Sequence, residues 1–114
     1  MKPGDIVLAR VPSGTELPAK LRPALVLAVL PGAVEGAVLV CGISSRTDRM
    51  LDGWDVPVEE ASRPLTGLKV PSVIRPSWLA TFGSGKGLRR LGELDSETLS
   101  AVRARVAAAI ASSA

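Results

Sequence analysis

Apolar residues along this chain gather into short runs separated by turn-forming residues. The longest run, Pro23–Leu30, has eight residues and no polar position, which is typical of a strand buried on both faces. Proline opens the run, where its missing N–H disturbs a strand least. The apolar segments Ile6–Val11 and Ala37–Ile43 predict two further strands, before and after it in the sequence.

Shorter segments continue this pattern beyond residue 50. Trp54–Val58 and Pro71–Arg75 predict short strands, whereas Trp78–Phe82 fits either a strand or a single helical turn. Several short strands at close spacing, with turn residues between them, indicate a small β-barrel rather than a parallel sheet. We therefore predict a barrel over residues 1–82.

The hydrophobic period changes near the C-terminus. Asp95 is a favourable N-cap, and Leu94 and Leu99 have the spacing of a hydrophobic staple. Apolar residues then recur at intervals of three and four, at Leu99, Val102, Val106 and Ile110. We predict an amphipathic helix over residues 95–111 that packs on the barrel. Residues 83–94 are expected to be a connector, within a single mainly β domain that spans residues 1–114.

Composition places the chain among ordinary globular proteins. Apolar residues make up 46% and charged residues 22%, so a core can form without disulfides or metal ions. Cys41 is the only cysteine, and its apolar segment makes it most simply a small core residue. No apolar run approaches the roughly 18–20 residues of a membrane span, and the N-terminus lacks the pattern of a signal peptide. We therefore expect a cytoplasmic protein without membrane contact.

Charge restricts the chemistry more than it identifies a partner. The net charge is +3, with ten arginines and four lysines. Arginine suits bidentate phosphate contacts, but abundant alanine, glycine and proline indicate a coding bias that also raises the arginine count. The chain has no histidine and no tyrosine. A histidine general base, a histidine-containing metal site and a Ser-His-Asp triad are therefore excluded, and we predict no cofactor.

Arginine and serine residues at strand ends are the candidate ligand-binding groups. Arg22 lies at the start of the long apolar strand, where a fixed guanidinium suits phosphate. On this segment alone, a surface arginine beside a core strand is the simpler interpretation. Ser44 and Ser45 follow the strand Ala37–Ile43, and adjacent hydroxyls and amides there can bind an anion. This hypothesis gains weight if Arg22 and Arg75 converge on them.

Two other motifs have simpler explanations. Gly83–Gly87 lacks the spacing of a phosphate-binding loop, since Ala80 stands where that motif has glycine and Gly87 follows the lysine. Trp54 and Trp78 could stack on nucleobases. Aromatic residues are only 3% of the chain, however, so core packing is the better interpretation for at least one of them.

Five segments, in this order, resemble the MazF/PemK (Kid) family of toxin–antitoxin toxins. They are Lys2–Leu8, Gly14–Leu27, Gly42–Ser45, Gly67–Arg75 and Leu91–Asp95. The resemblance implies a small SH3-like barrel that forms a homodimer and cuts single-stranded RNA at short sequences without a metal ion. It also implies a small antitoxin partner, whose acidic, partly disordered tail orders on the basic face of the toxin.

The resemblance implies roles for individual residues as well. A ribose 2′-hydroxyl would attack its own phosphate, which leaves a cyclic phosphate and a free 5′-hydroxyl. Arg22 would clamp that phosphate, and Ser44 and Ser45 would donate hydrogen bonds to it. Arg75 would stabilise the developing charge, because a guanidinium gives up its proton with difficulty.

One position departs from the family pattern. The family usually carries Asp or Glu two residues after the arginine that Arg75 matches, and this chain has Ser77 there. Glu16, in the loop before the arginine that starts the long apolar strand, is the best replacement for that acid as the general base. In the loop after the two serines, Arg46 and Arg49 are expected to contact RNA.

Two alternatives stay open. A non-catalytic member of the family would keep phosphate, RNA or antitoxin binding after losing the acid at position 77. A CcdB-like protein would act on a protein target through the same fold, and its pocket arginines would then be dispensable. Restoring an acid at Ser77 separates the first alternative from the ribonuclease hypothesis, since it should raise a weak cleavage activity if the site is otherwise intact.

Overall fold

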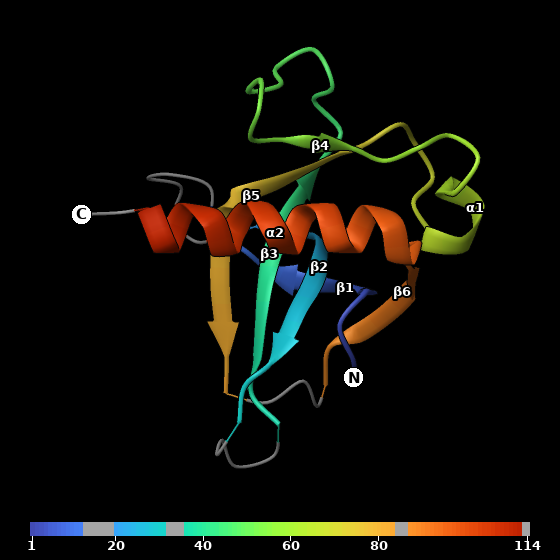
Figure 1. The fold of residues 1–114 in the computed structure, drawn as a ribbon. Helices are drawn as coiled ribbons and strands as arrows, with labels where there is room; N and C mark the ends of the chain where they lie inside the picture. The colour runs from blue at the N-terminus through green and yellow to red at the C-terminus, as the bar shows by residue number, and fades with distance from the viewer. Residues whose placement is uncertain (13–19, 32–35, 84–86, 113–114) are drawn as a thin grey trace.

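The computed structural model describes residues 1–12, 20–31, 36–83 and 87–112. Within these residues, six strands form one antiparallel sheet in the order β4-β5-β3-β2-β1-β6. Figure 1 shows the long helix α2 crossing one face of this sheet. The predicted mainly β fold with a C-terminal helix is confirmed. The elements are β1 (Asp5–Arg10), β2 (Leu21–Val29), β3 (Val38–Ser44), β4 (Val56–Pro57), α1 (Arg63–Thr66), β5 (Val73–Phe82), β6 (Arg89–Glu93) and α2 (Ser96–Ser112).

Both faces of the sheet are buried, each under its own hydrophobic core. Because neighbouring residues of a strand point to opposite faces, one strand can contribute to both cores. One face packs against α2, and its core includes Ile6, Leu25, Cys41, Val102 and Val106. The other face has a second core of Val7, Ala24, Val26, Val38 and Val40, with Trp78 and Phe82 packed against it. Four consecutive residues of β2, from position 24 to position 27, are therefore buried, as its apolar run predicts.

Strand β5 joins two segments that the sequence suggested were separate. Pro71–Arg75 and Trp78–Phe82 contribute to one ten-residue strand, so the strand alternative for residues 78–82 is correct and the helical turn is wrong. Cys41 of β3 pairs with Leu79, but the next residue of β3, Gly42, pairs with Arg75. The three residues between these partners form a bulge, which is where a strand tolerates a proline such as Pro76.

The sequence predicts a connector over residues 83–94, but the segment between β5 and α2 contains a strand. Five of its residues form β6, which pairs with β1, so that Glu93 lies opposite Asp5. The alternation in this strand is too short to be recognised without its partner. A single helical turn, α1, was also not expected, and it packs closely on β6. A Cβ at Gly92 would lie 2.3 Å from the carbonyl oxygen of Leu65, so only glycine permits this contact.

Helix α2 follows its predicted cap and most of its predicted apolar face. Asp95 Oδ2 accepts hydrogen bonds from Thr98 N at 2.9 Å and Thr98 Oγ1 at 2.8 Å, as an N-cap does. Val102 and Val106 are buried, whereas Ile110 is 68% exposed. The prediction is wrong for Ile110 because the last turn of α2 extends past β5 (Figure 1). No helix in the described part of the chain is long and apolar enough to cross a membrane.

Candidate functional site

Trp78, in the bulge of β5, brings the two candidate arginines together. The guanidinium carbon of Arg22, on β2, lies 4.9 Å from the centroid of the Trp78 ring. The guanidinium carbon of Arg75, on β5, lies 5.2 Å from the same ring. Such cation–π contacts contribute about 0.5–2 kcal/mol each, depending on how far they are desolvated. The two candidate arginines therefore meet at one indole ring.

A glycine makes room for this ring. Gly42 lies opposite Arg75 in the β3–β5 pairing. A Cβ at Gly42 would lie 2.7 Å from Cε3 and 3.1 Å from Cβ of Trp78. The side chain of Trp78 thus covers the backbone of β3 at Gly42, just before the last two residues of that strand, Ile43 and Ser44. Trp78 is half-buried, so it serves as a core residue and also lines the site.

Arg75 is held firmly from two sides. Its Nη1 donates to Asp55 Oδ2 at 2.5 Å, and its Nη2 donates to the carbonyl oxygen of Arg46 at 3.0 Å. The side chains of both ion-pair partners are buried, with Arg75 9% exposed and Asp55 0% exposed. The sequence reasoning missed Asp55. A signal was present, because an acid inside the apolar segment Trp54–Val58 needs a charged partner once it is buried.

The loop after β3 presents the predicted serines and two of the predicted arginines. Ser44 is buried, and its Oγ accepts a hydrogen bond from Arg46 N at 3.0 Å, which leaves its O–H free to donate. Ser45, Arg46 and Arg49 are exposed. The Arg46 guanidinium hydrogen-bonds the Asp48 carboxylate at 3.2 Å and lowers the pKa of that carboxyl group. This loop is therefore ordered by local polar contacts and by its carbonyl bond to Arg75.

Two adjoining hollows lie in the described part of the chain on either side of this loop. The wide hollow has a volume of about 630 Å³, and the narrow hollow has a volume of about 280 Å³. Ser44 and Arg46 line both. The cations of the wide hollow are Lys20, Arg22, Arg46, Lys69 and Arg89. Those of the narrow hollow are Arg46, Arg49 and Arg75, beside Leu51, Ser77 and Trp78. No described carboxylate lines either hollow, so both favour an anion.

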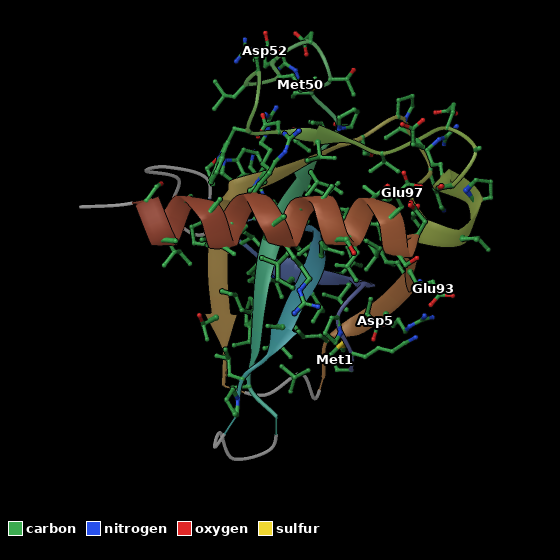
Figure 2. The ribbon with its side chains drawn as sticks, viewed as in Figure 1. Met1, Asp5, Met50, Asp52, Glu93 and Glu97 are labelled. Carbon is green, nitrogen blue, oxygen red and sulfur yellow. The ribbon has the colours of Figure 1, made fainter. Side chains whose placement is uncertain are left out.

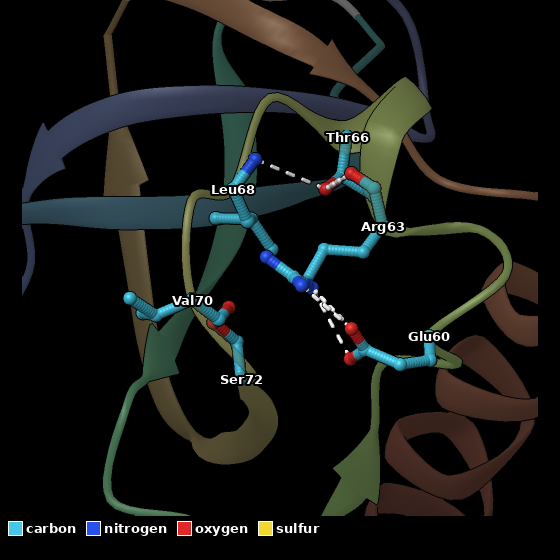
Figure 3. Close-up of polar contacts among 6 residues, drawn as sticks. All are labelled: Glu60, Arg63, Thr66, Leu68, Val70 and Ser72. Atoms are coloured by element: carbon cyan, nitrogen blue, oxygen red, sulfur yellow. Dashed lines mark hydrogen bonds and ion pairs between the residues drawn. The ribbon is translucent and has the colours of Figure 1, made fainter.

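Local hydrogen bonds fix the segment that walls the wide hollow (Figure 3). Thr66 Oγ1 donates to the carbonyl oxygen of Arg63 at 2.6 Å and accepts from Leu68 N at 3.1 Å. Ser72 Oγ donates to the carbonyl oxygen of Val70 at 2.9 Å. Arg63 also pairs with Glu60 at 2.6 Å. Leu68, Val70 and Ser72 therefore reach the hollow from a segment with a defined backbone.

A separate group of acidic side chains lies near β6 and the start of α2. Figure 2 shows Asp5, Glu93 and Glu97 near β6 and the N-terminal end of α2, far from the loop that carries Met50 and Asp52. Asp5 and Glu93 are paired with basic residues there, through contacts of Asp5 with Arg90 at 3.1 Å and of Glu93 with Lys2 at 3.5 Å. In the described part of the chain, no three potential metal-ligating side chains come together, so we identify no residues there that could hold a metal ion.

Two predicted positions bear on a general base. Glu16 lies outside the described residues. Ser77 is exposed and lines the narrow hollow, so the position of the family's acid does face the site. Ser77 lines that hollow together with Arg75.

Fold and site together define a class: a small, curled β-sheet domain that carries a surface of arginine, lysine and serine side chains. A family model described as "PemK-like, MazF-like toxin of type II toxin-antitoxin system" matches residues 2–110. The chain belongs to this PemK/MazF family of toxin–antitoxin toxins. No curated protein sequence matches the chain significantly.

Solved structures of MazF toxins share the fold. MazF from Deinococcus radiodurans is 18% identical, with a TM-score of 0.67, 96% of this chain covered and 94% of that chain. A MazE–MazF complex from the same organism is 18% identical, with a TM-score of 0.66 and coverage of 99% and 98%. The toxin MazF-mt6 from Mycobacterium tuberculosis is 25% identical, with a TM-score of 0.62 and coverage of 96% and 97%.

Proposed function

We propose that this protein is the toxin of a toxin–antitoxin pair and that it cleaves single-stranded RNA without a metal ion. The observation that carries the proposal is the pair of adjoining hollows, in which every described polar side chain except the Trp78 indole is serine, arginine or lysine and none is a carboxylate. A flexible polyanion suits two cationic hollows that meet at one loop, because it can bend to enter both.

The proposed reaction is an internal transfer at one phosphate. The ribose 2′-oxygen attacks phosphorus and the bond to the 5′-oxygen breaks, which gives a cyclic phosphate and a 5′-hydroxyl. The 2′-hydroxyl loses its proton to a base, and the leaving 5′-oxygen gains one. Arg22 binds the phosphate, and Ser44 and Ser45 donate hydrogen bonds to it. The guanidinium and these hydrogen-bond donors together stabilise the crowded phosphorane.

In this scheme Arg75 supplies a positive charge at a fixed position. It lies at the wall of the narrow hollow, and it contacts the same Trp78 ring as Arg22, which lines the wide hollow. A guanidinium stabilises the phosphorane by charge and hydrogen bonds rather than by giving up its own proton. Arg46 and Arg49, at the rim of the same hollow, contact the RNA chain on either side of the scissile phosphate.

Glu16 is the proposed base. In the sequence it precedes Lys20 and Arg22 by four and six residues, and both of these cations line the wide hollow. Ser77 is a poor base near neutral pH, and neither hollow contains a described carboxylate. A hydroxyl rather than an acid at Ser77 favours a second candidate function, in which the protein binds RNA or antitoxin through the same cations but does not cleave.

Partners follow from the same proposal. One of the matched structures is a complex of MazE with MazF, and we propose that this chain likewise binds an antitoxin with an acidic tail. The excess of cations over carboxylates in the wide hollow would attract such a tail. We further propose that the toxin forms a homodimer and acts on RNA in the cytoplasm.

Cleavage of a mixed-sequence single-stranded RNA in EDTA tests the proposal. Intact protein should give products with cyclic phosphate ends, and Arg22→Ala should abolish them. Arg103→Ala is the matched control, since Arg103 is exposed on α2 away from both hollows. RNA retained but not cut, in a way that depends on Arg22, would support the non-catalytic function. Neither cleavage nor retention would refute both and indicate a protein target.

A further inference from the structure

The hydrogen bonds of the Asp55 carboxylate orient the guanidinium of Arg75. Its Oδ2 accepts from Arg75 Nη1 at 2.5 Å and from Leu51 N at 3.0 Å. Its Oδ1 is buried and has no hydrogen-bond partner among the described residues. All the bonds of this carboxylate therefore converge on the oxygen that faces Arg75, which fixes the direction of the guanidinium.

Helix α2 holds the backbone of Asp55 in place. Arg105 is half-buried, and its Nη1 donates to the carbonyl oxygen of Asp55 at 2.9 Å. Asp55 N donates in turn to the carbonyl oxygen of Leu51 at 2.9 Å. A chain of contacts therefore runs from the helix, through Asp55, to Arg75, the residue before the bulge of β5.

The ion pair also determines what Arg75 can do. A buried guanidinium without its carboxylate would be an uncompensated charge, and it would turn towards solvent or towards an anion. With Asp55 in place, one Nη is engaged by the carboxylate and the other reaches the carbonyl oxygen of Arg46. Arg75 thus connects the Ser44–Arg46 loop to Asp55, the residue before β4, and lines the narrow hollow.

We infer that Asp55 is a positioning residue for Arg75 in RNA cleavage, and that Arg105 holds Asp55 in register from α2. The inference rests on the proposed function above. It assigns to two residues outside the hollows a role in aligning the group that stabilises the phosphorane. Neither residue touches the RNA.

The test is a double-mutant cycle measured by cleavage kinetics. Asp55→Asn keeps the shape of the side chain and removes its charge. A misplacement of about 1 Å in a catalytic group costs on the order of 100-fold in rate, so we expect kcat to fall by about that factor while KM changes little. In an Arg75→Ala background the same Asp55→Asn change should have almost no further effect on kcat, because the group that it positions is absent.

A merely structural role would give a different result. If Asp55 only stabilises the fold, its effect on the melting temperature would be large while kcat of the folded fraction stays near that of the intact protein. Should Asp55→Asn fail to fold, Arg105→Ala replaces it, since this change removes a contact from a half-buried side chain. Its loss of kcat should be smaller, and it should also vanish in the Arg75→Ala background. Arg103→Ala, on the same helix, is the control.

Three outcomes separate this inference from the proposed function. Loss of kcat that depends on Arg75 supports it. Cleavage by Asp55→Asn at the intact rate, or a loss that adds fully to that of Arg75→Ala, overturns it while the ribonuclease function stands. Absence of cleavage by the intact protein refutes the proposed function and this inference together.

Discussion

Replacing Gly42 by alanine tests whether Trp78 organises the site. The new methyl group would lie 2.7 Å from Trp78 Cε3, whereas ordinary carbon–carbon contacts are about 3.5–4.0 Å. The indole must therefore move by roughly 1 Å, since the backbone of β3 is paired on both sides with β2 and β5. Arg22 and Arg75 both contact that ring and would lose their common support.

The substitution should lower both the stability of the protein and its rate of RNA cleavage, for separate reasons. Overpacking of this kind costs about 1–3 kcal/mol, which corresponds to a fall in Tm of roughly 4–12 °C for a domain of this size. Displacement of the two arginines by about 1 Å should lower the rate of RNA cleavage on the order of 100-fold. The loss of activity should therefore greatly exceed what the unfolded fraction at 25 °C explains.

Thermal unfolding and RNA cleavage, measured on the same samples, provide the assay. Gly83→Ala is the matched control, because a Cβ there has nothing within 4 Å, and it should leave both quantities nearly unchanged. Near-native Tm and cleavage in Gly42→Ala would refute the reasoning. So would a fall in cleavage that simply follows the fall in stability.

Three further predictions concern single groups. Asp95→Ala should destabilise the protein by about 0.5–2 kcal/mol. Burial raises the pKa of Asp95, but hydrogen bonds from Thr98 outweigh this and leave the pKa lowered. Its contribution should therefore be complete above the ordinary value of 3.8 and disappear as the pH falls through the lowered pKa, and melting of both forms between pH 2 and 7 would show this. Burial raises the pKa of Cys41 to about 12, so the native thiol should resist alkylation at pH 7.5, and rapid modification without unfolding would contradict its buried position. Ser77→Asp should raise cleavage and give a rate that increases with pH through the pKa of the new carboxyl group, whereas an unchanged rate would show that the base is not what limits the reaction.

Much of the fold could be predicted from local pattern. The apolar run of β2 and the capping residue of α2 are properties of neighbouring residues, so the sequence was sufficient for both. The bulge of β5 was not predictable in this way. It depends on how Arg75 and Leu79 pair with β3, and the proline at position 76 reads locally as a strand break.

The candidate site was predictable only in part, for the same reason. Arg22, Ser44 and Arg75 could be proposed because they lie at strand ends or in segments with a family resemblance. Asp55 is 20 residues from Arg75 and Arg105 is 50 residues from Asp55, so their contacts exist only in the folded chain. Nothing in the local sequence around either residue names its partner.

The bulge at residues 76–78 has a consequence for how this protein can evolve. Side chains alternate between faces with a period of two, so removing a single residue from β5 would transfer Ala80 and Phe82 from the second core to the opposite face. The exposed side chain at position 77 is under no such constraint, because it points out of the core. An acid or a hydroxyl can therefore stand at this position without disturbing the fold, whereas the length of the strand around it is fixed by the two cores.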